Sequence, residues 1–263
     1  MRVFAYTLIT CLVLVGCSDQ KLDERPMVFL LLGQSNMVGS GRTADLGYDV
    51  RWPSSVRYFD RQGEKDVLQG NRFGPEISMA TRFAQVFAGR EVRLLKVAVG
   101  GTSLLDWAPQ WDSTRAAITG NAWAGPMYTH AIEALDSLRA AEEVYVAAAF
   151  WMQGERDARF ADVGRDYYGR LDTLITSLRS DVGRDDLPFI LGIVNPPPER
   201  YPAEEDVRAA QRRAAEEIAG VVLVDTDDIS KWDDRLHYDS EGNLELGRRF
   251  AEAYLGFSGL DPH

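Results

Sequence analysis

Cysteine is nearly absent from this chain of 263 residues, which holds only Cys11 and Cys17, both within the first twenty residues. A disulfide framework is therefore excluded for the rest of the chain. Histidine is scarce as well, because His130, His237 and His263 are the only three. No cluster of His, Cys and carboxylate residues has the spacing of metal ligands. We expect no metal and no other cofactor.

The chain also has fewer basic than acidic side chains. The chain has 29 Lys and Arg against 40 Asp and Glu, which gives a net charge of −11 and a pI near 4.8. Such a charge disfavours nucleic acid and anionic membrane surfaces as main partners, and a neutral substrate suits it better. The apolar share of 45% and the lack of repeats are typical of one compact domain.

No apolar run is long enough to span a bilayer. The run at residues 3–15 follows Arg2, and this pattern is typical of a signal peptide. It ends in LVGC at residues 14–17, which resembles a bacterial lipobox. The resemblance implies an exported lipoprotein, anchored to a bacterial membrane by acyl chains on Cys17. The alternative is an ordinary signal peptide in which Cys17 has no role.

Cleavage before Cys17 would remove Cys11, so no intrachain disulfide would be possible. It would also remove Arg2 and so take the net charge of −11 one unit lower. The predicted organisation is a lipoprotein signal peptide at 1–16, the lipidated cysteine and a linker at 17–26, one globular domain at 27–257 and a tail at 258–263.

Short apolar runs alternate with helical patterns along the predicted domain. The alternation predicts an α/β fold with a parallel sheet of about five strands, covered by helices on both faces. The predicted strands are residues 27–32, 92–99, 144–152, 188–194 and 221–224. The predicted helices are residues 77–87, 127–141, 162–179, 203–218 and 240–255.

Polar stretches follow four of the predicted strands, three of them directly and the last after a short loop. The carboxyl ends of parallel strands share one edge of the sheet, where α/β proteins place their sites. We therefore expect these stretches to converge. They are residues 33–36, 100–103, 153–157 and 233–237.

His237 is the best candidate for a general base. Asp234 stands three residues before it, a spacing that lets a carboxylate reach the imidazole Nδ1. His130 lies in a helical pattern with no acid placed to orient it, and His263 is the last residue. Ser35, in the turn after the first strand, is the matching nucleophile. The plainer interpretation is that Asp234 and His237 lie in a surface loop without a catalytic role, and that Ser35 is an ordinary serine in a turn.

Three donors are candidates for an oxyanion hole, the group of hydrogen-bond donors that stabilises a tetrahedral intermediate. They are the backbone N–H of Ser35, a backbone N–H of Gly100 or Gly101, and the side-chain amide of Gln153. Each such donor contributes roughly 10²–10³ in rate. Gly100 and Gly101 remain alternatives at this point.

Four blocks of residues follow one another in order along the chain: GQSNM at 33–37, VGGTS at 99–103, WMQGERD at 151–157 and DRLH at 234–237. In these blocks the chain resembles the SGNH hydrolases, in the branch shared by sialate O-acetylesterase-like proteins and family 6 carbohydrate esterases. The resemblance implies a three-layer α/β/α fold and a Ser35–His237–Asp234 triad without a metal. It also implies that the substrate is an acetylated carbohydrate, such as acetylxylan, sialic acid or a similar glycan.

The chain departs from the general SGNH pattern in two blocks. Gln34 stands where the first block usually has Asp, and Gln153 where the third has Asn. Gln34, Asn36 and Glu155 are expected to support the site. Glu155 is expected to brace the loop that holds Gln153, and it is also the alternative to Asp234 as the acid of the triad.

Other residues near the blocks have two readings each. Trp107, Trp111 and Trp123 follow the second block and either stack on sugar rings or pack their loop. Arg156 and Asp157 are expected to form a structural charge pair, with direct contact to the substrate as the alternative. The proline-rich residues 195–198 are expected to shape the rim.

Two alternative functions use the same fold. A lipase or thioesterase would need an apolar channel for its acyl chain, and no apolar loop run follows the blocks. A glycan-binding protein without activity would not need Ser35, Asp234 and His237 together. An α/β-hydrolase is disfavoured, because its nucleophile lies in Gly-x-Ser-x-Gly and Ser35 is followed by Asn36 and Met37.

Overall fold

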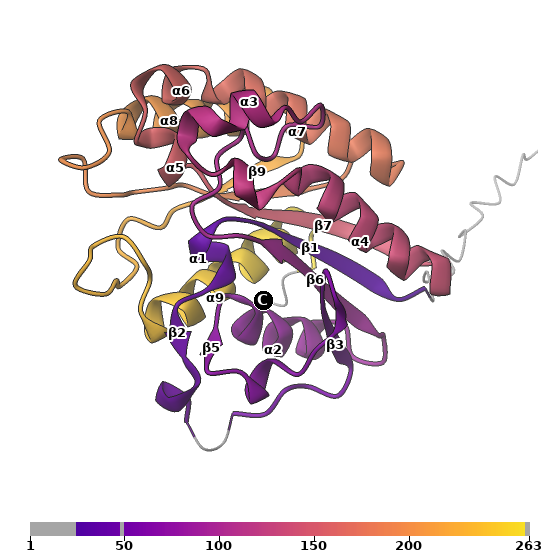
Figure 1. Ribbon diagram of the computed structural model, residues 1–263. Coiled ribbons are helices and arrows are strands. Elements are labelled where there is room, and N and C mark those ends of the chain that lie inside the picture. Colours follow the sequence, from indigo (N-terminus) through magenta and orange to yellow (C-terminus); the bar gives the residue numbers. More distant parts are fainter. Residues whose placement is uncertain (1–24, 48–49, 261–263) are drawn as a thin grey trace, which may run out of the picture.

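The structure of the chain is a computed structural model that describes residues 25–47 and 50–260. The predicted signal peptide, Cys17 and His263 lie outside these residues. Within them the chain forms three layers, a twisted central sheet with helices on both faces (Figure 1). The predicted α/β fold is confirmed.

The central sheet has seven strands in the described part of the chain, two more than the five predicted. Its order is β4-β3-β6-β1-β7-β8-β9, and all neighbours are parallel except β4, which is antiparallel to β3. The predicted strands are present as β1 (Met27–Gly33), β6 (Val92–Ala98), β7 (Tyr145–Met152), β8 (Phe189–Gly192) and β9 (Val221–Val224).

The prediction missed two strands at the edge of the sheet, β3 (Val56–Asp60) and β4 (Gly63–Glu64). β3 has only five residues with Arg57 among them, and β4 has two, so neither contains an apolar run that marks a strand. A separate antiparallel pair is formed by β2 (Gly41–Arg42) and β5 (Arg72–Phe73).

Five long helices cover the sheet where the periodicity predicts them. Helices α2 (Glu76–Val86) and α9 (Ser240–Phe257) pack together on one face. Helices α4 (Met127–Ala141), α7 (Tyr167–Val182) and α8 (Glu204–Glu217) cover the other face (Figure 1). Among residues 25–47 and 50–260, no helix is both long and apolar enough to cross a membrane.

The predicted helix at 162–179 is two helices in the structure. The chain turns at Asp166, between α6 (Ala161–Arg165) and the start of α7, which runs on to Val182. The remaining short elements are α1 (Ser35–Val38), α3 (Ser113–Ala116), α5 (Glu155–Ala158) and 3₁₀ turns at Thr43–Asp45, Val67–Gln69, Ala117–Thr119 and Ala122–Ala124.

The core lies on both sides of the central strands. All seven residues of β1 are buried, as expected for a parallel strand that is covered on both faces. Phe29 of β1 stacks on Phe83 of α2 with ring centroids 4.3 Å apart, and it meets Tyr254 of α9 edge-on at 5.0 Å. These contacts hold α2 and α9 against the sheet, so the carboxyl ends of β1, β6 and β7 are held in fixed positions.

Candidate active site

Ser35 stands at the carboxyl end of β1, as the first residue of α1. Gly33 has a φ of +145°, and a Cβ there would overlap the carbonyl oxygen of Met152 in β7. Only glycine can adopt this conformation here. The N–H of Gln34 donates to the carbonyl oxygen of Met152 at 2.9 Å and so stabilises the turn. Ser35 is the first residue of a helix, so no carbonyl of that helix accepts its N–H.

His237 and Asp234 reach Ser35 as the sequence predicts. The His237 Nε2 lies 3.1 Å from the Ser35 Oγ, and the His237 Nδ1 lies 2.6 Å from the Asp234 Oδ2. These are hydrogen-bond distances, so the three side chains form one continuous chain of hydrogen bonds. About a third of the His237 side chain is exposed, 32%, which leaves the pair open to a substrate and to water.

The loop that carries Asp234 and His237 is bent back on itself. Arg235 lies in the left-handed region with a φ of +57°, and the N–H of Trp232 donates to the carbonyl oxygen of His237 at 2.9 Å. The Asp234 Oδ1 accepts the N–H groups of Leu236 at 2.8 Å and His237 at 2.9 Å. Partial burial opposes ionisation of Asp234, but these bonds and the imidazole lower its pKa overall.

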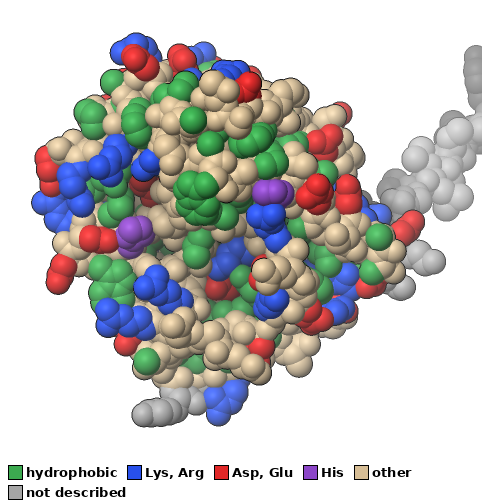
Figure 2. Space-filling view, in the orientation of Figure 1, with side chains coloured by type: hydrophobic (Ala, Val, Ile, Leu, Met, Phe, Trp, Pro, Cys, Tyr) green, Lys and Arg blue, Asp and Glu red, His purple; other side chains and the backbone are tan. Residues whose placement is uncertain are grey.

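A cavity of about 390 Å³ opens above Ser35 and His237. Acidic and basic side chains are interspersed over the face seen in Figure 2, without a large patch of one sign. In the described ranges, no three His, Cys, Asp or Glu side chains gather as metal ligands would. The cavity is lined by Gln34, Ser35, Gly100, Gly101, Asn121, Trp123, Glu155, Arg156, Arg159, Tyr201, Leu236 and His237.

Asn36 joins the nucleophile turn to the histidine loop. Its Nδ2 donates to the carbonyl oxygen of Leu236 at 3.1 Å, and its Oδ1 accepts the N–H of Tyr238 at 3.2 Å, so it binds the residues on both sides of His237. Glu155 accepts from the Asn36 Nδ2 at 2.7 Å, and burial raises the pKa of Glu155. Glu155 therefore braces Asn36, and this bond ties the loop that carries Gln153 to the nucleophile turn.

Gln153 does not present its amide to the cavity. The side chain is fully buried, and its Nε2 donates to the Asp157 Oδ2 at 2.6 Å and to the carbonyl oxygen of Thr102 at 2.9 Å. The hydroxyl of Tyr167 has one proton, and it lies 2.8 Å from the backbone carbonyl oxygen of Gln153 and 3.1 Å from the Oε1. Because both N–H groups of the amide have acceptors inside the protein, the predicted role of Gln153 as an oxyanion donor does not agree with the structure.

Arg156 and Asp157 form no charge pair in the structure, contrary to expectation. Asp157 is fully buried and accepts the N–H of Leu104 at 3.1 Å, which ties the second block to the third. Burial raises the pKa of Asp157 to about 7. Arg156 points the other way, lines the cavity and donates to the carbonyl oxygen of Thr119. Successive residues of a helix point about 100° apart, so the two side chains leave the short helix α5 in different directions.

Gly100 is the glycine that faces the nucleophile. A Cβ placed on Gly100 would lie 3.7 Å from the Ser35 Cβ, whereas one on Gly101 would meet the Asn121 Nδ2 at 2.7 Å. The carbonyl oxygen of Gly101 accepts from the same amide. Gly101 therefore shapes the loop, and the N–H of Gly100 is better placed as a donor beside Ser35.

The three tryptophans after the second block have different positions. Trp107 is fully buried and packs edge-on against Trp151 at 5.0 Å. Trp111 is half-buried and does not line the cavity, whereas Trp123 lines it and is 73% exposed. Only Trp123 has a free face for a sugar ring. The sequence analysis missed Asn121, Arg159 and Tyr201 in the lining, because none belongs to a block.

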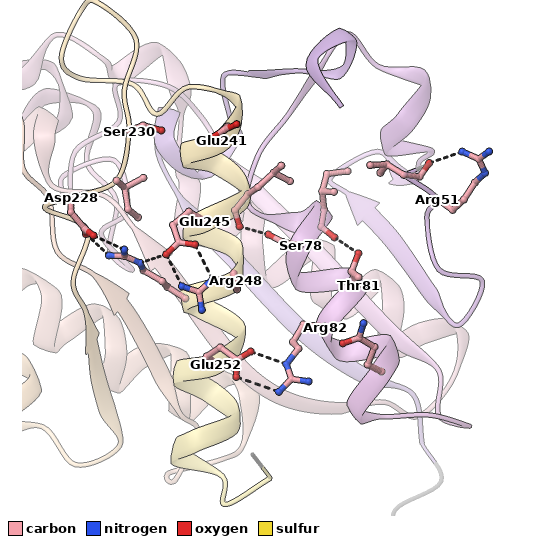
Figure 3. A pocket seen from close by; sticks show the side chains of 16 residues that line it. Arg51, Ser78, Thr81, Arg82, Asp228, Ser230, Glu241, Glu245, Arg248 and Glu252 are labelled. Carbon is pink, nitrogen blue, oxygen red and sulfur yellow. Dashed lines mark hydrogen bonds and ion pairs between the residues drawn. The ribbon is translucent and has the colours of Figure 1, made fainter. Parts of the chain in front are cut away.

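A larger hollow, of about 1190 Å³, lies elsewhere, between α2, α9 and the loop after β9 (Figure 3). Six of its charged side chains form three ion pairs across the hollow or along α9, with nitrogen to oxygen distances of 2.6 to 2.8 Å. None of the four sequence blocks and no histidine lines this hollow, so we place the site at Ser35. The pairs are Arg82–Glu252, Arg248–Glu245 and Arg249–Asp228.

A comparison with known families decides the assignment. The profile of the family described as "Carbohydrate esterase, sialic acid-specific acetylesterase" matches residues 25–256. The chain belongs to this family of carbohydrate esterases. The match covers nearly the whole described structure and all four blocks, and it confirms the resemblance to the sialate O-acetylesterase-like branch. As a member of the sialic acid-specific acetylesterase family, the protein is a carboxylic ester hydrolase.

Named relatives of the family agree with this assignment. The chain is 26% identical over 255 residues to the "Probable carbohydrate esterase" of Arabidopsis thaliana, a match that covers 87% of this chain and 90% of the relative. The solved structure of a protein from the same locus in that plant superposes with a TM-score of 0.72 and 23% identity, covering 88% of this chain and 98% of the other.

Two further solved structures share the fold at lower identity. A carbohydrate acetylesterase from Xanthomonas citri matches with a TM-score of 0.68 and 17% identity, over 89% of this chain and 56% of its own. A GDSL-like lipase from Parabacteroides merdae matches with a TM-score of 0.52 and 13% identity, over 90% of this chain and 98% of its own. These likenesses show that the family member described here has the SGNH hydrolase fold.

Proposed function

We propose that this carbohydrate esterase removes O-acetyl groups from glycans, with Ser35 as nucleophile, His237 as general base and Asp234 as the acid that orients it. The observation that carries the proposal is the hydrogen-bonded chain from Ser35 through His237 to Asp234, with distances of 3.1 and 2.6 Å, on the wall of the cavity. Nucleophile, base and orienting acid in contact are the parts that acyl transfer requires.

The reaction then has two stages. The Ser35 Oγ attacks the acetyl carbonyl carbon while its proton passes to the His237 Nε2, and the carbonyl oxygen becomes an oxyanion facing the N–H groups of Ser35 and Gly100. The intermediate collapses, the bond from the acyl carbon to the sugar oxygen breaks, and His237 protonates that oxygen. In the second stage water attacks the acetyl-enzyme, His237 takes its proton, and acetate leaves as Ser35 recovers a proton.

The lining of the cavity supports a short acyl group and a sugar. Gly100, Gly101 and Gln34 line the cavity together with Ser35, so a short acyl group on the nucleophile meets backbone and amide groups. Trp123, which is 73% exposed, offers a face for a sugar ring. These features favour an acetylated carbohydrate over the fatty acyl ester of a lipase.

Two arginines make the cavity more cationic than the net charge of the chain predicts. Arg156 and Arg159 line it, and in the described residues neither forms an ion pair with a carboxylate. A guanidinium binds a carboxylate with two parallel hydrogen bonds. This local charge favours an acetylated sugar that carries a carboxylate, such as sialic acid, over neutral acetylxylan.

We expect acetate release from O-acetylated sialic acid to be about 10- to 100-fold more efficient, in kcat/KM, than release from acetylated xylan. One charge-assisted contact contributes about 1.5–3 kcal/mol, which corresponds to this ratio. With p-nitrophenyl esters, kcat/KM should fall by about 10² from acetate to octanoate. Acetate is measured by an enzyme-coupled assay and p-nitrophenol by absorbance.

The variant Arg159→Gln should reduce the preference for the acidic sugar. Arg165→Gln, which changes an exposed arginine outside the cavity, is the matched control.

Equal rates of the wild-type protein on both glycans would refute the preference for an acidic sugar. Faster hydrolysis of octanoate than of acetate would instead identify a lipase or thioesterase.

We also propose that the protein is exported and anchored to a bacterial membrane by acyl chains on Cys17, a proposal supported by the lipobox-like residues 14–17. Cys17→Ser should abolish metabolic labelling with palmitate and move the protein from the membrane fraction to the soluble fraction, or leave it unprocessed. Cys11→Ser, which changes a cysteine inside the predicted signal peptide, is the control and should keep the label. Undiminished labelling of Cys17→Ser would contradict the anchor.

A further inference from the structure

We propose that a pocket at the end of β6, which we call the β6 pocket, binds an anionic sugar unit next to the acetylated one, so that the substrate is an acidic oligosaccharide or polysaccharide. The proposal rests on the esterase function at Ser35. The pocket has a volume of about 410 Å³, close to the 390 Å³ of the catalytic cavity and within the usual range of small-molecule sites. It is lined by Asp60, Arg61, Gln62, Lys96, Val97 and Ala98.

The β6 pocket begins beside the nucleophile turn. Ala98, the last residue of β6, lines the pocket and pairs with Gly33 of β1, which stands two residues before Ser35. Two residues after Ala98, Gly100 lines the catalytic cavity. Two residues of fully extended chain span at most about 7 Å, so the walls of the two sites lie within that distance here. Neighbouring units of one glycan can therefore reach both sites.

The segment from Trp123 to His130 runs from the catalytic cavity to the β6 pocket. Trp123 lines the cavity, and a Cβ added to Gly125, two residues later, would lie 3.2 Å from the Cε1 of His130. In the described residues neither ring nitrogen of His130 has a hydrogen-bond partner, although Nδ1 is buried. Burial lowers the pKa of His130, and the charge of Arg61 in the β6 pocket lowers it further. Arg61 and His130 are therefore close neighbours beyond the exposed face of Trp123.

Two basic side chains of the β6 pocket retain donors for a ligand. The Arg61 side chain is exposed, and it has no hydrogen-bond or ion-pair partner in the part of the chain that the structure describes. The Lys96 Nζ donates to the Glu76 Oε2 at 2.8 Å and to the carbonyl oxygen of Val38 at 2.9 Å, which leaves one of its three protons. Figure 2 shows Lys or Arg side chains in and beside a hollow of this face, with histidine near its edge.

Asp60 is the acidic member of the lining, and groups of its own turn compensate its charge. Its Oδ1 accepts the N–H of Gln62 at 2.7 Å and lies 4.0 Å from the Nζ of Lys65. The Arg61 guanidinium stays free for a carboxylate, which it can bind with two parallel hydrogen bonds. In a chain with a net charge of −11, an unpaired guanidinium next to the catalytic cavity favours a sugar unit that carries a carboxylate over a neutral one.

The kinetics of Arg61→Gln test the β6 pocket with p-nitrophenyl acetate, with O-acetylated sialic acid and with an O-acetylated oligomer of sialic acid. On the oligomer, kcat/KM should fall about tenfold, mainly through KM, because a charge-assisted contact to a remote unit is the same in the ground state and the transition state. On the two smaller substrates it should stay close to wild type, since neither reaches Arg61.

Arg115→Gln is the matched control for this variant. Arg115 is an exposed arginine of α3 that also has no side-chain partner in the described ranges and lies outside both the cavity and the β6 pocket. It should keep the wild-type kinetics on all three substrates. Equal losses of Arg61→Gln on the monomer and the oligomer, or no loss on the oligomer, would overturn the role of the β6 pocket while the esterase function stands.

A second readout does not depend on turnover. A carboxylate bound at Arg61 should raise the pKa of His130, because a nearby negative charge favours the imidazolium. Glu133 on α4 already acts in this direction, and Arg61 acts in the opposite one. Binding should accordingly tighten as the pH falls through the pKa of His130. NMR follows the His130 Cε1–H signal through a pH titration with and without the unacetylated acidic oligomer, and His130→Gln identifies the signal.

The two readouts separate this proposal from the esterase function. An oligomer that binds without changing the titration of His130 would overturn the β6 pocket as its site. A wild-type protein that binds the oligomer beside His130 but hydrolyses none of the three esters would support the β6 pocket and refute the esterase function.

Discussion

Replacing Ser35 with alanine is expected to lower kcat for acetate release by roughly 10⁴–10⁶-fold, to the level that binding and the oxyanion donors alone sustain. The Oγ of Ser35 lies 3.1 Å from the His237 Nε2. The substitution therefore removes the nucleophile and the hydrogen bond that His237 makes to it. The fold should be unchanged, because the turn depends on Gly33 and the bond from Gln34 to Met152. The measurement is p-nitrophenol release from the acetyl ester, with circular dichroism as a fold check.

Ser137→Ala is the matched control for this variant, because Ser137 is an exposed serine on α4 that lies outside the cavity. It should keep wild-type kcat. Full activity in Ser35→Ala would refute the mechanism. A wild-type protein that binds acetylated glycans but releases no acetate would instead be a glycan-binding protein without activity.

Asp234→Asn is expected to lower kcat by up to about 10⁴, the size of the effect that loss of the orienting aspartate has in a serine protease. The asparagine amide can turn its N–H toward the His237 Nδ1, which stabilises the tautomer that cannot accept the proton of Ser35. The ionised Asp234 accepts from that nitrogen at 2.6 Å. Glu155→Gln should cost much less, because Glu155 contacts Asn36 and not His237, and glutamine can still accept from Asn36.

The comparison of these two variants decides which acid belongs to the triad. Asp233→Asn, one residue away and exposed, is the control for the loss of one negative charge. All three are measured for kcat with the acetyl ester. If Asp234→Asn stays near wild type while Glu155→Gln is folded and inactive, Glu155 is the orienting acid and the proposed triad is wrong.

The alternation of apolar runs and helical patterns was enough to predict the α/β fold and five of the seven strands. β1, β7 and β8 are almost entirely buried, so each is a continuous apolar run that can be recognised without its neighbours. The prediction did not include β3 and β4, which lie at one edge of the sheet. β3 has five residues and is stabilised by pairing with β6, and β4 has two residues and is stabilised by pairing with β3. Their sequences contain no comparable signal.

Ser35, Asp234 and His237 could be singled out from the sequence because their chemistry is local. Asp234 and His237 are three residues apart on one loop, and Ser35 follows a strand whose carboxyl end must lie at the edge where sites form. The expected roles of Gln153 and Arg156 do not agree with the structure, because each depends on which of several possible hydrogen-bond partners the fold brings nearest.

The sequence by itself therefore determined the fold class, the order of the four blocks, the family and the residues of the proposed triad. Only the tertiary structure decided that Gly100 and not Gly101 faces Ser35, that Trp123 and not Trp107 is exposed, and which way each amide points. The contacts that decide these points join residues far apart in the chain, such as Gln153 with Gln34 and Glu155 with Asn36, 119 positions away in both cases. Periodicity and spacing carry no information about such contacts, because an amide is oriented by all the donors and acceptors packed around it.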